Sequence, residues 1–182
     1  MKKNLFFGLF ATMMLLLTTA CQQDEVFVDG NATVTFKVST PEMVTRAYSD
    51  GTMATRLQYA VYDAAGNYLP ALTETDATIN LKTKVQLQLT TGNQYRLVFW
   101  ADAVTAPYEV DFENKAMTIN YDGVVSNRED LDAFYRDTTF TVTGRMNVDI
   151  DLYRPFAQLN IGTSDFAETA DAGYAVTSAS VT

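Results

Sequence analysis

Three short acidic stretches hold the residues whose types and spacing could support acid–base chemistry. They are Asp111 and Glu113 in "DFE", Glu129, Asp130 and Asp132 in "EDLD", and Asp149 and Asp151 in "DID". Glycoside hydrolysis needs two carboxyl groups that converge on one cleft. The first and last pairs occupy alternate positions of predicted strands, so each pair shares the face opposite the apolar one. We interpret these faces as solvated and predict that the chain is not an enzyme.

Several classes of site are excluded by the residue types that the sequence lacks. The chain has no histidine and one cysteine, which excludes Ser-His-Asp and Cys-His catalysis, thiolate zinc sites and an internal disulfide. The turns "YSDGT" and "NYDGV" carry one acid before each glycine, too few for a calcium loop. We therefore predict no metal and no cofactor. The net charge of −9, with no run of Lys or Arg, argues against a nucleic-acid partner.

The single cysteine, Cys21, follows a segment with the layout of a secretory signal peptide. Lys2 and Lys3 form a positive start, residues 5–17 are almost continuously apolar, and small residues occupy 18–20. The apolar stretch is too short to span a bilayer as a stable helix. The sequence therefore predicts a signal peptide over residues 1–20.

The position of Cys21 resembles the lipobox of bacterial lipoproteins, although Thr18 stands where leucine is usual and Leu17 lies one step earlier. This resemblance implies that Cys21 is acylated and that residues 21–32 form a polar tether. Each buried acyl methylene contributes about 0.8 kcal/mol, so two or more chains anchor a protein stably. The "QQDE" directly after Cys21 resembles the export signal of Bacteroidota surface lipoproteins, which implies the outer face of the outer membrane. The alternative is an ordinary cleaved signal peptide followed by an unpaired cysteine.

Alternation with a period of two residues dominates the rest of the chain. It predicts strands at 33–39, 55–63, 77–93 and 94–101, the last apolar on both faces and therefore central, and further strands at 108–113, 117–123, 139–144, 147–153 and 157–163. We therefore predict an all-β fold, an antiparallel Greek-key β-sandwich over residues 33–182.

Short helices are predicted in two crossovers. The stretch 126–135 has Ser126 and Glu129 at the spacing of a capping box, and 164–173 begins with Ser164 as a candidate N-cap. The strand-like stretch 174–182 lies at the end of the sequence. It is either a final strand or a sign that the chain is truncated and that partner strands lie further on.

Several stretches together resemble the fimbrillin-like lipoproteins of Bacteroidota, which include subunits of type V pili. They are "TRAYSDG" (45–51), "LQYAVYDAAGNYL" (57–69), "YRLVFWA" (95–101), "DAFYRDTTFTV" (132–142) and, the most specific, "RPFAQLNIGTSDF" (154–166). The resemblance implies a fimbrillin- or transthyretin-like sandwich, exported as a lipoprotein and able to join a surface fibre.

The same resemblance implies assembly by strand exchange. A protease cuts after an arginine in the loop that follows the first strand, and a strand of the next subunit fills the vacated groove. The matching position is Arg46, before Ala47. The alternative is that Arg46 is an ordinary loop residue. A cut there would also remove Cys21 with its lipid, so one molecule cannot be both a cleaved subunit and a lipid-held anchor.

These observations lead to one hypothesis and a runner-up. The hypothesis is an outer-membrane, lipid-anchored surface protein with a structural or adhesive role, a fimbrial subunit or anchor. Its expected partners are the membrane, other fimbrillin-like subunits and a host or bacterial surface ligand. The runner-up is a surface glycan-binding lipoprotein of a nutrient-uptake system, in which exposed aromatic residues would stack on sugars.

Overall fold

The structure is a computed structural model that describes residues 30–41, 50–124 and 128–156. Over these residues it is nearly all β, which confirms the predicted fold class. The strands are β1 (Asn31–Ser39), β2 (Arg56–Asp63), β3 (Glu74–Thr78), β4 (Lys82–Thr90), β5 (Gln94–Asp102), β6 (Tyr108–Asp111), β7 (Ala116–Ile119), β8 (Ala133–Thr141) and β9 (Met146–Asp151). Two single 3₁₀ turns, η1 (Pro70–Leu72) and η2 (Glu129–Leu131), lie between strands.

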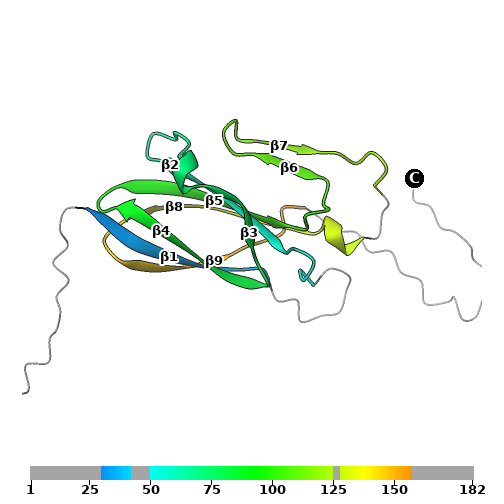
Figure 1. Ribbon diagram of the computed structural model, residues 1–182, viewed down its shortest axis with the longest axis horizontal. Helices are drawn as coiled ribbons and strands as arrows, with labels where there is room; N and C mark the ends of the chain where they lie inside the picture. The colour runs from blue at the N-terminus through cyan, green and yellow to red at the C-terminus, as the bar shows by residue number, and fades with distance from the viewer. Residues whose placement is uncertain (1–29, 42–49, 125–127, 157–182) are drawn as a thin grey trace, which may run out of the picture. The chain divides into compact units, whose positions relative to one another are not determined.

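Two sheets pack face to face and enclose the main core (Figure 1). One sheet has the order β4-β1-β9 and the other β3-β2-β5-β8. Strand β5 lies between β2 and β8, as its apolar sequence predicts. The core consists of the alternate side chains that the two sheets turn toward each other, among them Phe36, Phe99 and Phe134, all 0% exposed. Burial of these rings stabilises the sandwich, because each ring removes a large apolar area from water.

One strand pairing departs from the antiparallel prediction. Strand β1 pairs antiparallel with β4 but parallel with β9, from Val34↔Met146 to Ser39↔Asp151. Parallel neighbours cannot be joined by a hairpin and need a long connection. Here that connection includes all the strands of the other sheet, because β1 opens the described chain and β9 closes it. The sequence order alone carries no sign of this pairing.

The hairpin β6–β7 forms a third layer on the outer face of the four-stranded sheet (Figure 1). It buries Tyr62, Trp100, Tyr108 and Phe112 in a second cluster. Tyr62 Oη donates to the carbonyl of Phe112 at 2.7 Å, which joins the hairpin to β2. The face of β2 that alternation predicts as exposed is therefore covered.

Two predicted elements are wrong in detail. The stretch 77–93 is not one strand: it breaks between β3 and β4, where Leu81 has a φ of 58° and the chain passes from one sheet to the other. The helix predicted over 126–135 is only the turn η2, and β8 begins at Ala133. The predicted strand at 157–163, the predicted helix at 164–173 and the terminal stretch 174–182 lie outside the described residues.

Within the described ranges, no helix has the length and apolar character that crossing a membrane would require.

Candidate functional site

The acidic pair on β9 faces solvent and contacts β1. Asp149 lies 3.4 Å from Lys37 Nζ, and Asp151 accepts a hydrogen bond of 2.8 Å from Ser39 Oγ. Both aspartates are exposed, as the alternation predicts. They connect two neighbouring strands across the outside of the sheet and do not face a cleft.

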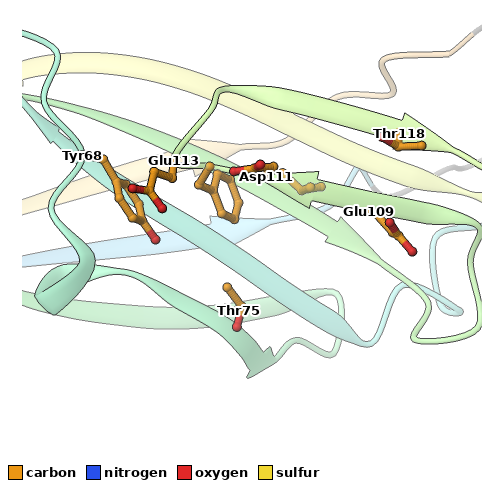
Figure 2. Close-up of a pocket in the computed structure, with 8 residues that line it drawn as sticks. Tyr68, Thr75, Glu109, Asp111, Glu113 and Thr118 are labelled. Atoms are coloured by element: carbon orange, nitrogen blue, oxygen red, sulfur yellow. The ribbon is translucent and has the colours of Figure 1, made fainter.

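The acidic pair of the "DFE" stretch borders a shallow pocket of about 460 Å³ beside the β6–β7 hairpin (Figure 2). Asp111 accepts hydrogen bonds from the backbone and side-chain nitrogens of Asn114, at 2.9 and 2.7 Å. These bonds lower the pKa of Asp111, which keeps it ionised and engaged in its own turn. Glu109 lines the same pocket further along β6.

The acids of the "EDLD" stretch divide between surface and interior. Glu129 is exposed, whereas Asp130 and Asp132 are buried and paired with arginines. Arg128 hydrogen-bonds Asp130 and lowers its pKa. Arg154 donates two hydrogen bonds of 2.7 Å to Asp132. Both carboxylates are thus held in place by hydrogen-bonded arginine pairs.

A further buried carboxylate, Asp102, was not among the sequence candidates. It is 0% exposed and accepts bonds from Arg56 Nε (2.8 Å), Arg56 Nη2 (2.9 Å) and Trp100 Nε1 (2.9 Å). The sequence feature that could have pointed to Asp102 is its position at the end of an otherwise apolar strand, two residues after the only tryptophan of the chain. Because Trp100 is 4% exposed, it packs in the interior and cannot stack on a sugar.

Within the described ranges, no group of three or more His, Cys, Asp or Glu residues is arranged to hold a metal ion. Three candidate residues from the sequence, Cys21, Arg46 and Ala47, lie outside the described residues. The lipidation and cleavage predictions therefore stay predictions.

Among the described residues, the candidate functional site is the place that β1 occupies in its sheet. This strand lies between β4 and β9 and pairs with both. We call the space it occupies the β1 slot. Its inward side chains are Ala32, Val34, Phe36 and Val38, with exposures of 7, 0, 0 and 1%. The three larger ones contribute about 1.5–3 kcal/mol each through burial.

The centre of the β1 slot is an aromatic pocket for Phe36. The Phe36 ring lies 5.9 Å from the ring of Phe99 and 5.4 Å from that of Phe140, the second contact edge-on. Such contacts add to the energy of burial. The pocket fixes the register of β1, because a slip by one residue would turn Phe36 to solvent.

The outward face of β1 is polar and forms side-chain hydrogen bonds with β4. Gln88 Nε2 donates to Thr33 Oγ1 at 2.9 Å, and Thr90 Oγ1 donates to Asn31 Oδ1 at 2.9 Å. In the β1 slot, β1 is therefore held by main-chain pairing on two sides, an apolar inner face and a polar outer face. Chemically, the slot can bind a β-strand.

The described residues define an all-β sandwich in which β1 is the central strand of the three-stranded sheet. The chain belongs to a family of unknown function (DUF6562), whose family model matches residues 23–182. None of the curated proteins matches it in sequence.

Two solved structures are similar to the chain. One is a Bacteroides thetaiotaomicron protein described as a proposed polysaccharide-binding protein (DUF1812), with 18% identity, a TM-score of 0.46 and coverage of 68% of this chain and 47% of that one. The other is the fimbrial anchor protein Mfa2 of Porphyromonas gingivalis, with 12% identity, a TM-score of 0.45 and coverage of 67% and 50%. The chain thus matches about half the length of either protein.

Proposed function

We propose that this chain is a lipid-anchored surface protein of a bacterial outer membrane with a structural or adhesive role, a fimbrial subunit or anchor that joins a fibre by strand exchange. It performs no catalysis. The observation that carries the proposal is the place of β1, which is first in the described chain yet central in its sheet. Its loss would leave a groove with two unpaired strand edges and an empty aromatic pocket.

The connection after β1 supports the same proposal. It leads from one sheet to the other and contains Arg46, outside the described residues. A single cut after Arg46 would separate β1, together with the lipid on Cys21, from all the other strands. The remaining chain would then need a strand from another subunit to complete its sheet.

The anchoring half of the proposal rests on the signal-peptide layout and on Cys21. A molecule that keeps residues 21–46 stays on the membrane and ends or begins a fibre. A molecule cut after Arg46 leaves the membrane once β1 and its lipid are displaced, and can then be added within a fibre. One sequence would thus serve either role, according to whether it is cut.

N-terminal sequencing of the protein recovered from intact cells tests this proposal. We expect one population that begins at acylated Cys21 and, where fibres are present, a second that begins at Ala47. Protein that begins only at Cys21 would contradict assembly by this cut. Protein that begins at Lys2 or within the apolar segment would contradict the lipid anchor.

A further inference from the structure

The two ends of β1 are held very differently in the β1 slot. Residues Asn31–Thr33 pair with β4 alone, because the pairing with β9 begins only at Val34. The single inward side chain in this part is Ala32, the smallest of the four. Opening this end therefore breaks one ladder and the two side-chain hydrogen bonds from Gln88 and Thr90, and it exposes little apolar surface.

The opposite end of β1 is clamped from both sides. Ser39 pairs with Lys82 of β4 and with Asp151 of β9, and its hydroxyl donates to Asp151 at 2.8 Å. Its carbonyl accepts from the Leu152 amide at 2.8 Å. One residue further, Thr40 is 2% exposed and its amide donates to the Leu81 carbonyl at 2.9 Å.

We propose that a strand entering the β1 slot displaces β1 from its Asn31 end, and that a cut after Arg46 does not by itself release β1. This inference rests on the proposed function. The cut removes a covalent link on the side of Ser39 and Thr40, where the contacts are strongest, so the cut strand stays bound. The incoming strand pairs first where β1 has one neighbour and then replaces it residue by residue toward Ser39.

The shape and polarity of the β1 slot also determine the direction and the side chains that the incoming strand must have. It runs antiparallel to β4 and parallel to β9, as β1 does. Alternate inward positions are apolar, with an aromatic ring at the position of Phe36 to fill the pocket between Phe99 and Phe140. The partner is therefore an extended segment of another subunit with this alternation.

Strand exchange on the cut protein tests the direction of displacement. The full chain, solubilised in mild detergent, carries a sequence-specific protease site inserted after Arg46. After the cut, a labelled peptide with the sequence of residues 30–41 is added in excess and its uptake is followed by fluorescence anisotropy. The same peptide with Phe36→Ala is the control for binding in the slot and should exchange poorly.

Two matched variants of the chain distinguish the ends, because each removes one hydroxyl of β1 without a change of charge. Thr33→Val removes the acceptor of the Gln88 bond, and Ser39→Ala removes the donor to Asp151. Since the bond from Gln88 is one of the contacts that must break before the Asn31 end can open, we expect Thr33→Val to speed exchange about three- to five-fold. Ser39→Ala should change the rate by less than about two-fold, because its bond breaks after the rate-limiting opening.

Amide hydrogen exchange on the uncut chain gives a second readout. Amides at Ala32 and Thr33 should exchange faster than those at Val38 and Thr40. Faster peptide uptake with Ser39→Ala than with Thr33→Val, absence of exchange in every variant, or stronger protection at Ala32 would each overturn the inference. These outcomes are separate from the N-terminus found in cells, which tests whether the slot is used for assembly.

Discussion

At the residue scale, the strongest stability prediction concerns Asp102. Asp102→Ala would leave the Arg56 guanidinium and the Trp100 indole N–H without their acceptor in the interior. We expect a loss of about 3–5 kcal/mol in the free energy of unfolding, measured by urea denaturation. The control is Asp149→Ala, which breaks an exposed pair with Lys37 and should cost less than about 1 kcal/mol. Equal losses in the two variants would contradict the structural role of Asp102.

Tyr108 gives the second residue-scale prediction, a loss of stability at alkaline pH. Burial raises the pKa of Tyr108 from 10.0 to about 12. Below pH 10 this tyrosine is neutral in the folded and unfolded chain, so its contribution is fully present. Between pH 10 and 12 only the unfolded chain ionises, so the free energy of unfolding falls as the pH rises.

The Tyr108→Phe variant checks this prediction in chemical denaturation series from pH 8 to 12. It should unfold more easily at pH 8, by about 1 kcal/mol, because the hydroxyl no longer donates to the Leu131 carbonyl. Its decline above pH 10 should be shallower than that of the unchanged chain. An identical decline in both proteins would show that Tyr108 does not contribute to it.

At the element scale, β1 should be a principal source of stability although it is the strand proposed to leave. Phe36→Ala empties the pocket between Phe99 and Phe140 and should lower the free energy of unfolding by about 3–5 kcal/mol. Thr35→Ala on the outward face of the same strand removes only the 3.3 Å bond from Gln86 and should cost less than about 1 kcal/mol. Similar costs at both positions would contradict the inward orientation of Phe36.

At this scale, the sequence predicts which segments form strands, but it does not predict where a strand breaks or which strands pair. Val34, Phe36 and Val38 face inward as alternation requires, and the apolar run ending at Trp100 is central. The break at Leu81 could not be predicted, because the residue with positive φ is a leucine and not the glycine that usually marks such a position. The parallel pairing of β1 with β9 joins residues more than a hundred positions apart, which local patterns cannot encode.

At the scale of the whole molecule, the sandwich and the β6–β7 layer should behave as separate cooperative units. Phe112 anchors the hairpin in the second cluster, and its carbonyl accepts the Tyr62 hydroxyl. In Phe112→Ala, hydrogen exchange should lose protection over 108–119 while β1 and β5 keep theirs. Uniform loss of protection across both sheets would show that the hairpin is part of one unit with the sandwich.

For the candidate site, the sequence predicts which residue types face solvent and which face the core, but it does not predict the site's location. The alternation correctly predicts that Asp149 and Asp151 are solvated, and the structure places both aspartates beside β1. The buried pairs of Asp102 and Asp132 were hidden, because each forms only when distant strands meet. The slot itself depends on the strand order β4-β1-β9, which no local motif specifies.

The central claim is that β1 leaves its slot during assembly, and a reversible lock tests it most directly. Thr33 and Gln88 lie opposite each other in the β1–β4 register, so Thr33→Cys with Gln88→Cys can form a disulfide that holds β1 in place. Fibre formation is then measured on the surface of cells that make this double variant, with each single variant as a control. We predict that fibres incorporating the protein disappear while the disulfide is closed and return on reduction. Fibres that form undiminished with the disulfide closed would contradict strand exchange at the β1 slot.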